Sequence, residues 1–296
     1  MIEIDVTSGE VETGTLTEAH RDAAVRAILE DGVVALRNVV ALEHLDVLHA
    51  RMLDDLEALR QRSDAPFNWN VGNIQQDPPP FPPYLFRDVL LNEQVIAVTS
   101  AVLGPGVKNR FYSGNTAMPS DQRQPVHADT NHLWPRLEVA HPAAELVVNI
   151  ATVDISPENG STELWPGTHL DVTAAAGKDI KIPAEVIEAR RAVRPPFQPT
   201  VPRGSVIIRD IRMWHAGMPN RTDRPRPMIA MIHACRWLQT GAPLRFPVAT
   251  EPFFEHPVLR TCAKFVDEPI DHIHAPVGYE YSVLAAQSTE PRQRTV

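Results

Sequence analysis

The spacing of apolar residues divides the chain into a helical first third and a β-rich remainder. Between residues 15 and 62, apolar positions recur every three or four residues on both sides of the apolar stretch 32–40, which predicts two helices. Thr15 and Glu18 have capping-box spacing at the start of the first helix, and Gly32 marks its end. The second helix carries an apolar stripe made of Leu45, Leu48, Met52, Leu56 and Leu59.

A third apolar segment, 88–104, predicts another helix, and the proline run at 77–83 predicts a rigid loop before it. From about residue 107 the pattern changes to short runs of β-branched and aromatic residues, which are broken by glycine, proline and asparagine. The strands that these runs predict lie within 107–115, 145–155, 204–214 and 227–238. A further helix is predicted at 183–191, inside a long connection.

Short strands after a helical start favour a mainly β fold with flanking helices, arranged as a jelly-roll barrel. We expect one domain over residues 1–296. In it, residues 1–106 form a mostly helical part packed on the barrel, 107–240 form the β core, and 241–296 form a C-terminal extension. The 28 prolines among 296 residues agree with this fold, because proline is confined to turns, loops and strand ends.

Composition excludes several classes of function. The net charge of −9 makes a nucleic-acid partner unexpected, because binding to a phosphate backbone needs clustered Lys and Arg. No apolar run approaches the roughly 20 residues that a membrane-spanning helix requires. The only cysteines, Cys235 and Cys262, form no CxxC pair, and the N-terminus is acidic, unlike a targeting peptide. These features predict a cytoplasmic protein, and nothing marks a self-complementary surface for oligomerisation.

The tripeptide His-x-Asp occurs three times, and two of the copies are poor metal ligands. His44 and Asp46 lie on the second predicted helix, where side chains two residues apart point in nearly opposite directions. His169 and Asp171 follow a Pro-Gly turn and precede an alanine-rich segment. Asp171 is therefore expected to cap a helix rather than to bind an ion.

The third copy, His127 and Asp129, follows Pro125, which favours extended backbone. In an extended chain residues i and i+2 share a face, so the two side chains can meet one ion, although a salt-linked pair is an equal alternative for this tripeptide alone. His215 ends a strong buried-strand run. Two histidines and one carboxylate form the facial triad of non-haem Fe(II) oxygenases, whose open positions accept a co-substrate.

Three arginines follow His215 and could bind a dicarboxylate. Arg221 and Arg224 are expected to be surface charges, whereas Arg226 begins the next predicted strand and has a defined direction. A guanidinium at that place matches the geometry of a carboxylate.

At this point three segments resemble the phytanoyl-CoA dioxygenase superfamily of Fe(II)/2-oxoglutarate oxygenases. They are HAD, NGSTELWPGTH and HAGMPNRTDRPR, which start at residues 127, 159 and 215. The resemblance implies a double-stranded β-helix fold of the jelly-roll, cupin-like kind, with His127, Asp129 and His215 as ligands of Fe(II). It implies that Arg226 and Asn149 bind the co-substrate 2-oxoglutarate, which reacts with O₂ to give succinate and CO₂.

A narrower likeness within this family, to a bacterial dioxygenase that oxidises an amine-bearing carbon of an aminoglycoside, covers nearly the whole chain through segments such as NVGNIQQDPPP, YSGN and RGSVIIRD. It implies a small polar substrate, such as an amino sugar, which is hydroxylated or converted to a ketone. Substrate contacts are then expected from Gln76 and Asp77 in the proline-rich loop, and from Asn131 and Trp134 after the metal carboxylate. The competing interpretations are a turn cap for the first pair and ordinary packing for Trp134.

Two other functions stay open. One is the same chemistry on an acyl-CoA or another lipid, which the acidic charge disfavours. The other is a non-catalytic, zinc-loaded jelly-roll binding protein, which has no need of Arg226. Asp129 makes halogenation unexpected, because halogenating relatives replace this carboxylate by a small residue.

Overall fold

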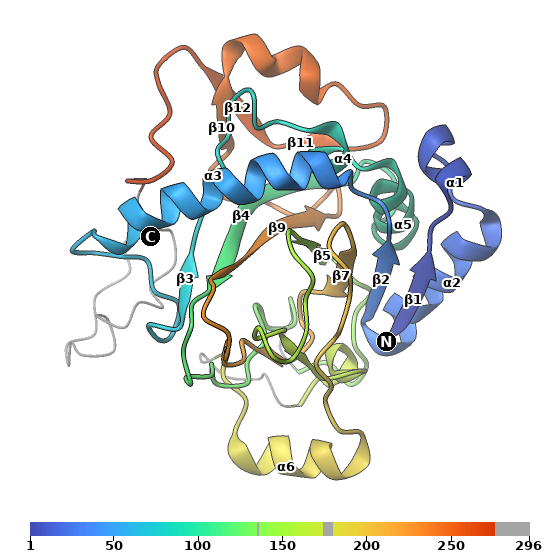
Figure 1. Cartoon of the computed structure of the whole chain (residues 1–296). Coiled ribbons are helices and arrows are strands. Elements are labelled where there is room, and N and C mark those ends of the chain that lie inside the picture. The colour runs from blue at the N-terminus through green and yellow to red at the C-terminus, as the bar shows by residue number, and fades with distance from the viewer. Residues whose placement is uncertain (135, 174–179, 276–296) are drawn as a thin grey trace.

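The structure, a computed structural model, describes residues 1–134, 136–173 and 180–275. Its central feature is a mixed sheet of eight strands (Figure 1). In sheet order the strands are β1 (Ile2–Asp5), β2 (Val33–Arg37), β7 (Val206–Asp210), β5 (Glu145–Ala151), β9 (Arg226–Ala234), β4 (Lys108–Ala117) and β11 (Arg260–Thr261), with β3 (Asn73–Gln75) paired to β4. In this sheet order, each adjacent pair of strands from β2 through to β4 is antiparallel. At the two edges, β1 pairs in parallel with β2, and β11 pairs in parallel with β4.

Two smaller sheets complete the β structure. Strands β6 (Glu163–Leu164) and β8 (His215–Ala216) pair in antiparallel, and isolated bridges join His127 to His215 and to Lys181. Strands β10 (Leu244–Pro247) and β12 (Ala263–Val266) form a parallel pair in the C-terminal part.

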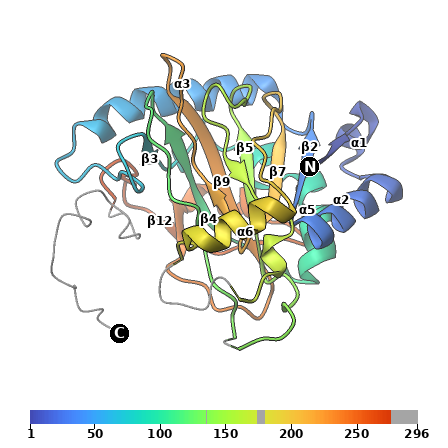
Figure 2. The same ribbon diagram turned by 90° about the horizontal axis from the view of Figure 1, so that it is seen from below.

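The helices lie mainly on one face of the large sheet. They are α1 (Ser8–Thr13), α2 (Glu18–Asp31), α3 (Leu42–Arg60), α4 (Arg87–Leu90), α5 (Glu93–Leu103) and α6 (Ala184–Val193), with short 3₁₀ helices η1 (Thr168–Leu170) and η2 (Val248–Phe254). Helix α6 lies apart from the others, at the bottom of Figure 1, and crosses in front of the sheet in Figure 2. No helix among the described residues is long and apolar enough to cross a membrane.

Alternation along the strands gives the large sheet two different faces. Leu146 and Val148 of β5 and Ile208 of β7 pack with α2, α3 and α5 in the main hydrophobic core. The residues between them, such as Val147 and Arg209, line a cavity on the opposite face. A strand side chain points to one face or the other with a period of two, so a single sheet provides both the core and the site.

The predicted strands and the long helix α3 are confirmed, and the predicted mainly β fold with flanking helices agrees with the structure. Two local predictions are wrong. Helix α2 is capped by Thr17, not Thr15, because the Thr17 side chain accepts from the backbone of His20. The segment 88–104 forms two helices, because the side chain of Asn92 caps a new start at α5. The apolar stretch 32–40, for which the pattern predicted no element, contains β2, so the mostly helical N-terminal part also contributes a strand to the large sheet.

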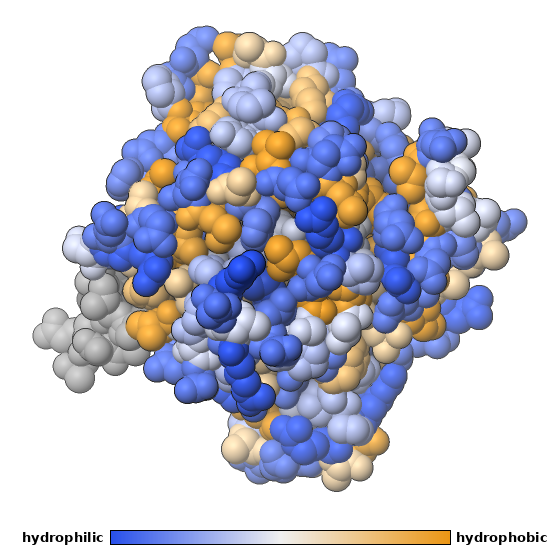
Figure 3. All heavy atoms as spheres, viewed as in Figure 1, coloured by the Kyte–Doolittle hydropathy of each residue, from blue (hydrophilic) through white to orange (hydrophobic). Residues whose placement is uncertain are grey.

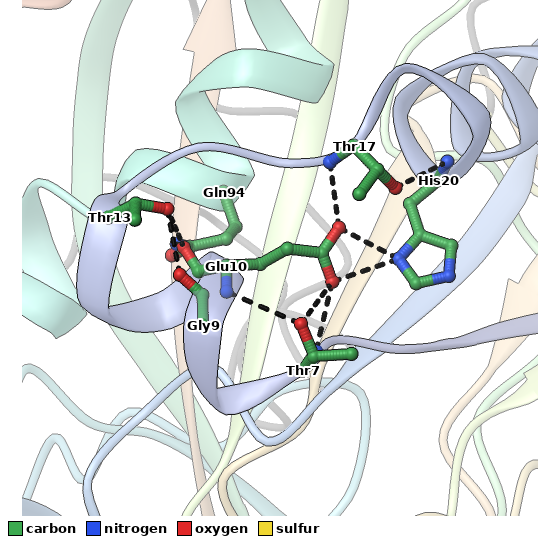
Figure 4. Close-up of polar contacts among 7 residues, drawn as sticks. All are labelled: Thr7, Gly9, Glu10, Thr13, Thr17, His20 and Gln94. Atoms are coloured by element: carbon green, nitrogen blue, oxygen red, sulfur yellow. Dashed lines mark hydrogen bonds and ion pairs between the residues drawn. The ribbon is translucent and has the colours of Figure 1, made fainter.

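A buried carboxylate fastens the N-terminal helices together (Figure 4). Glu10 of α1 is 5% exposed and accepts from the backbone N–H groups of Thr7 at 3.0 Å and Thr17 at 2.7 Å. His20 of α2 lies 2.9 Å from the same carboxylate. Burial alone would raise the pKa of Glu10, but the hydrogen bonds from Thr17 and Thr7 outweigh burial and lower the pKa to about 2.

We therefore expect Glu10→Gln to lower the free energy of unfolding by about 2 kcal/mol at pH 7. A depressed pKa gives stability that is full above pH 4.5, the usual value, and is lost as the pH falls towards 2. The difference between wild type and variant, measured by urea unfolding, should therefore shrink below pH 4.5. Glu12→Gln, an exposed acid of the same helix, is the matched control and should change neither quantity. An equal effect of both substitutions would contradict this role of Glu10.

Candidate functional site

Three side chains that could hold a metal ion meet where the small β6–β8 sheet faces the large one. His127 and His215 exchange backbone hydrogen bonds of 3.0 and 2.8 Å, which set their imidazoles side by side. Asp129 lies two residues further along the extended segment, with Oδ1 at 4.0 Å from His127 Nε2 and 3.4 Å from His215 Nε2. One ligand atom from each residue lies within 4.8 Å of the other two.

Hydrogen bonds on the far side of each ring orient both imidazoles. The Nδ1 of His127 lies 2.8 Å from the carbonyl of Pro125, and the Nδ1 of His215 lies 3.0 Å from the carbonyl of Met213. Because a carbonyl can only accept, each Nδ1 carries the hydrogen and each Nε2 keeps its lone pair for a ligand. Burial, with a smaller contribution from His215, lowers the pKa of His127 to about 3, so its ring is neutral at pH 7.

The third ligand, Asp129, has a buried cation as its neighbour. Nη2 of Arg209, on β7, donates to Oδ2 at 2.6 Å and leaves Oδ1 facing the imidazoles. Loss of water around Asp129 raises the pKa of its carboxyl, but Arg209 and then His215 outweigh this and hold the pKa well below its usual value. The carboxylate is therefore ionised and offers one oxygen to a metal.

A second buried guanidinium belongs to Arg226, at the start of β9. Its Nε donates to the carbonyl of Asn159 at 2.9 Å, and its Nη2 donates to the carbonyl of Gly160 at 2.8 Å. Its Nη1 has no hydrogen-bond partner among the described residues. Burial lowers the pKa of Arg226 to about 10, so the group stays charged at neutral pH.

The turn that holds Arg226 requires glycine. Gly160 has φ +77°, and a Cβ there would lie 2.7 Å from the carbonyl oxygen of Met218. Any other side chain is strained in that conformation and collides with the backbone. The Asn159-Gly160 pair thus fixes two carbonyl oxygens, which orient the guanidinium of Arg226.

A cavity of about 270 Å³ joins these groups. His127, Asp129, His215, Arg209 and Arg226 all line it. The large sheet contributes the inner faces of β4, β5, β7 and β9, and the small sheet contributes β6 and β8. A metal held by the three ligands would therefore face the same enclosed space as both arginines.

The rest of the cavity lining mixes apolar side chains with amides, and part of it comes from the N-terminal part. The amide side chains there are Asn68, Asn73, Gln75, Asn115, Gln124 and Asn149. The Oδ1 atoms of Asn68 and Asn73 are buried without a hydrogen-bond partner among the described residues. Trp69 lies between them in sequence; its ring centroid is 5.4 Å from that of His127 and 4.9 Å from Nζ of Lys181. An ion pair of Arg110 and Glu145 also lines the cavity.

The structure brings Asn149, Arg226 and the metal-binding triad into one cavity, but it does not bring the four expected substrate contacts there. Gln76 points the other way: its amide donates to the carbonyl of Met52 and accepts from Thr116. Asp77 is also outside the cavity lining. Burial raises the pKa of its carboxyl, although a hydrogen bond from Ser113 opposes this.

The other two expected contacts, Asn131 and Trp134, are likewise absent from the cavity lining. Trp134 is 50% exposed and packs against Trp237, with ring centroids 6.3 Å apart.

The remaining histidines of the sequence analysis have structural partners. His44 is 2.9 Å from Asp88 and not paired with Asp46, and His169 is 3.2 Å from the carbonyl of Leu29. The alanine-rich segment that Asp171 was expected to cap lies largely outside the described residues. A further histidine, His233, is buried against Thr99, and burial lowers its pKa to about 3.

Sequence analysis missed several residues of the cavity lining, among them Arg209, Trp69 and Asn68. Arg209 was part of an apolar strand run, where a lone arginine among buried residues was the available signal. Trp69 and Asn68 lie in a loop whose residues show no periodicity. The backbone of Trp69 has φ +71°, a conformation that no pattern of residues predicts.

A site with two imidazoles and a carboxylate on one side of a metal defines a class of mononuclear non-haem oxygenases. The comparison with protein families agrees: residues 28–228 match the family described as phytanoyl-CoA dioxygenase (PhyH). The match covers more than half of the chain, so the protein belongs to the phytanoyl-CoA dioxygenase family of Fe(II)/2-oxoglutarate-dependent oxidoreductases.

Individual relatives are distant. A curated relative, the dioxygenase andF of Emericella variicolor, is 24% identical over 156 residues, which are 51% of this chain and 50% of that protein. The chain thus matches about half the length of this relative.

Solved structures share the fold at low identity. AviO1 from Streptomyces viridochromogenes Tue57 has a TM-score of 0.57 at 22% identity, over 75% of this chain and 98% of that one. The epimerase SnoN, solved with Fe³⁺, alpha-ketoglutarate and nogalamycin RO, has a TM-score of 0.58 at 14% identity, over 85% and 98%. The carbocyclase SnoK from nogalamycin biosynthesis has a TM-score of 0.55 at 20% identity, over 78% and 87%.

The triad generates a direct prediction. Asp129→Ala should weaken Fe(II) binding by at least about 100-fold, because it removes a charged ligand. Asp46→Ala, in another His-x-Asp tripeptide, should leave binding unchanged, because its neighbour His44 pairs with Asp88. Anaerobic equilibrium dialysis against Fe(II) measures both. Comparable affinities for the two variants would show that the triad is not the iron site.

Proposed function

We propose that this protein is an Fe(II)/2-oxoglutarate-dependent dioxygenase that oxidises a small polar metabolite. The observation that carries the proposal is the unpartnered Nη1 of buried Arg226 in the cavity that His127, Asp129 and His215 also line. A charged donor without a partner is costly to bury, and a dicarboxylate bound beside it would satisfy it. A module that only stores a metal would have no use for this guanidinium.

In this proposal the triad holds Fe(II), while Arg226 binds the far carboxylate of 2-oxoglutarate. Asn149 of β5, which lines the same cavity, would donate to the same co-substrate. We also propose that the large and small sheets form a double-stranded β-helix barrel within one oxygenase domain. The cavity between the two sheets supports this arrangement.

Polar groups in the lining support a polar substrate. Five amides besides Asn149, the Arg110–Glu145 ion pair and the unpartnered oxygens of Asn68 and Asn73 suit a substrate with several hydroxyl or amino groups. Apolar residues such as Phe111, Ile207 and Ile232 also line the cavity and suit the carbon skeleton of a substrate. A fatty acyl chain, however, would desolvate the polar groups without replacing their hydrogen bonds. An amino sugar or another natural-product intermediate fits better, and the nogalamycin-related neighbours agree with the second kind.

Iron with 2-oxoglutarate and O₂ supplies the oxidising power to break a substrate C–H bond, giving an alcohol or a ketone along with succinate and CO₂. The chain supplies geometry and electrostatics. The carbonyl groups of Pro125 and Met213 orient the two imidazoles. Arg209 donates to Oδ2 of Asp129, so that Oδ1 faces the imidazoles. Trp69 packs beside His127, which is 4% exposed.

A spectroscopic experiment tests the proposal. Anaerobic addition of Fe(II) and 2-oxoglutarate should produce the visible charge-transfer band of the chelate. Arg226→Met should raise the 2-oxoglutarate concentration needed for half of the band by about 10- to 100-fold, the worth of a charge-assisted hydrogen bond. Arg224→Met, an exposed arginine two residues earlier, is the control and should behave as wild type. The absence of a band in wild type, with tight zinc binding instead, would sink the proposal.

Gly160 provides an independent check on how Arg226 is held. Gly160→Ala should weaken 2-oxoglutarate binding by about tenfold, because the strained turn moves both carbonyl acceptors of the guanidinium. Fe(II) affinity should stay the same, since no ligand lies in that turn. Gly241→Ala, where nothing approaches the added Cβ, is the matched control. A parallel loss of iron affinity would mean that the turn supports the whole site instead.

A further inference from the structure

Arg209 is a buried charge in a place where the fold does not need one. It is the fourth residue of β7, whose five residues are all buried, and its side chain is 7% exposed. The neighbouring inward residue on the same strand, Ile207, is apolar. A guanidinium at such a position costs several kcal/mol of desolvation unless its donors are satisfied.

The contacts of Arg209 place it at the metal end of the cavity. Its Nη2 is 2.6 Å from Asp129 Oδ2 and 3.5 Å from His215 Nε2, the atom whose lone pair is available for a metal. Its Nη1 is buried and has no hydrogen-bond partner among the described residues. Within the cavity lining, Arg226 is the other residue with an unpartnered Nη1.

Pairing with Asp129 alone does not account for this residue. Once a divalent ion is bound, the ion itself neutralises the carboxylate, and a guanidinium next to it is repelled. Two guanidiniums and a divalent ion then outweigh the single charge of Asp129. The loaded cavity is balanced only if further anionic groups lie near the metal as well as near Arg226.

We infer that Arg209 is a second carboxylate-binding residue, which donates through Nη1 to the metal-side carboxylate of the 2-oxo acid while Arg226 binds the far carboxylate. The pairing with Asp129 fixes the orientation of the guanidinium. This inference rests on the proposed function and gives the two arginines different roles. Arg209 recognises the 2-oxo acid end of the co-substrate, whereas Arg226 recognises the far carboxylate and therefore selects for the length of the molecule.

Three acids separate the two arginines. 2-Oxoglutarate carries both carboxylates, pyruvate carries only the one beside the keto group, and 4-oxobutanoate carries only the far one. The dissociation constant of each acid is measured by anaerobic calorimetry with the Fe(II)-loaded protein. The variants are Arg209→Met, Arg209→Lys and Arg226→Met, and Fe(II) affinity and thermal unfolding are recorded for all of them.

Arg209→Met should weaken the binding of 2-oxoglutarate and pyruvate by about 10- to 100-fold and should change the dissociation constant of 4-oxobutanoate by no more than about twofold. Arg226→Met should weaken the binding of 2-oxoglutarate and 4-oxobutanoate and leave the binding of pyruvate unchanged. Arg209→Lys keeps the charge but not the forked donors, so its loss should be intermediate. If Arg209→Met does not fold or does not bind Fe(II), the lysine variant decides, because its loss must still be confined to 2-oxoglutarate and pyruvate.

Two outcomes overturn the inference and differ from failure of the proposed function. If an Arg209 variant changes the affinity for all three acids equally, or changes only the affinity for Fe(II), the residue acts through Asp129 and does not bind a carboxylate of the co-substrate. If 2-oxoglutarate binding depends on Arg226 but not on Arg209, the inference fails while the proposed function stands. If wild type binds none of the acids, the proposed function itself fails.

Discussion

The backbone pairing between His127 and His215 is the constraint on which the rest of the site depends. The two residues are far apart in the sequence, and their reciprocal hydrogen bonds bring both imidazoles to one edge of the small sheet. Because Asp129 follows at the i+2 position of the same extended segment, the pairing also decides where the carboxylate lies. The large sheet then has to supply charges that match this cluster from across the cavity, and it does so through inward residues of β7 and β9.

Charge balance connects the site to the fold. Both inward arginines are buried, and each is held by oxygen atoms that the local structure fixes: Asp129 for Arg209, and the Asn159 and Gly160 carbonyls for Arg226. In a low-dielectric cavity these interactions are strong, and an unmatched charge is correspondingly costly. The protein thus stores unsatisfied donors that a dicarboxylate on a metal would complete. In the function proposed above, this preorganisation would cost stability in the empty cavity and would give selectivity for the co-substrate.

The sequence predicted best where local chemistry decides structure. Strongly alternating strands, the stripe of α3 and the extended His127–Asp129 pair followed directly from residue spacing. The wrong expectations came from single competing residues. Asn92 caps a helix inside an apolar run, and Thr17 replaces Thr15 as the cap of α2. Gln75 and Gln76 differ only by strand register: the first lines the cavity and the second bonds to α3, which no pattern of neighbouring polar residues distinguishes.

Arg209 shows a different kind of difficulty. Its buried position was predictable from the strand, but its partner Asp129 comes from a segment 80 residues earlier, so only the tertiary structure explains the charge. The same holds for the amide-rich side of the cavity, where the segment containing Asn68 and Asn73 belongs to the largely helical N-terminal part and reaches the cavity by pairing β3 with β4. His215, Arg209 and Arg226 lie on paired strands, so their positions tolerate little change. Asn68 lies on a loop and Asn73 begins the short edge strand β3, so we expect substitutions there to alter substrate contacts without disturbing the proposed iron site.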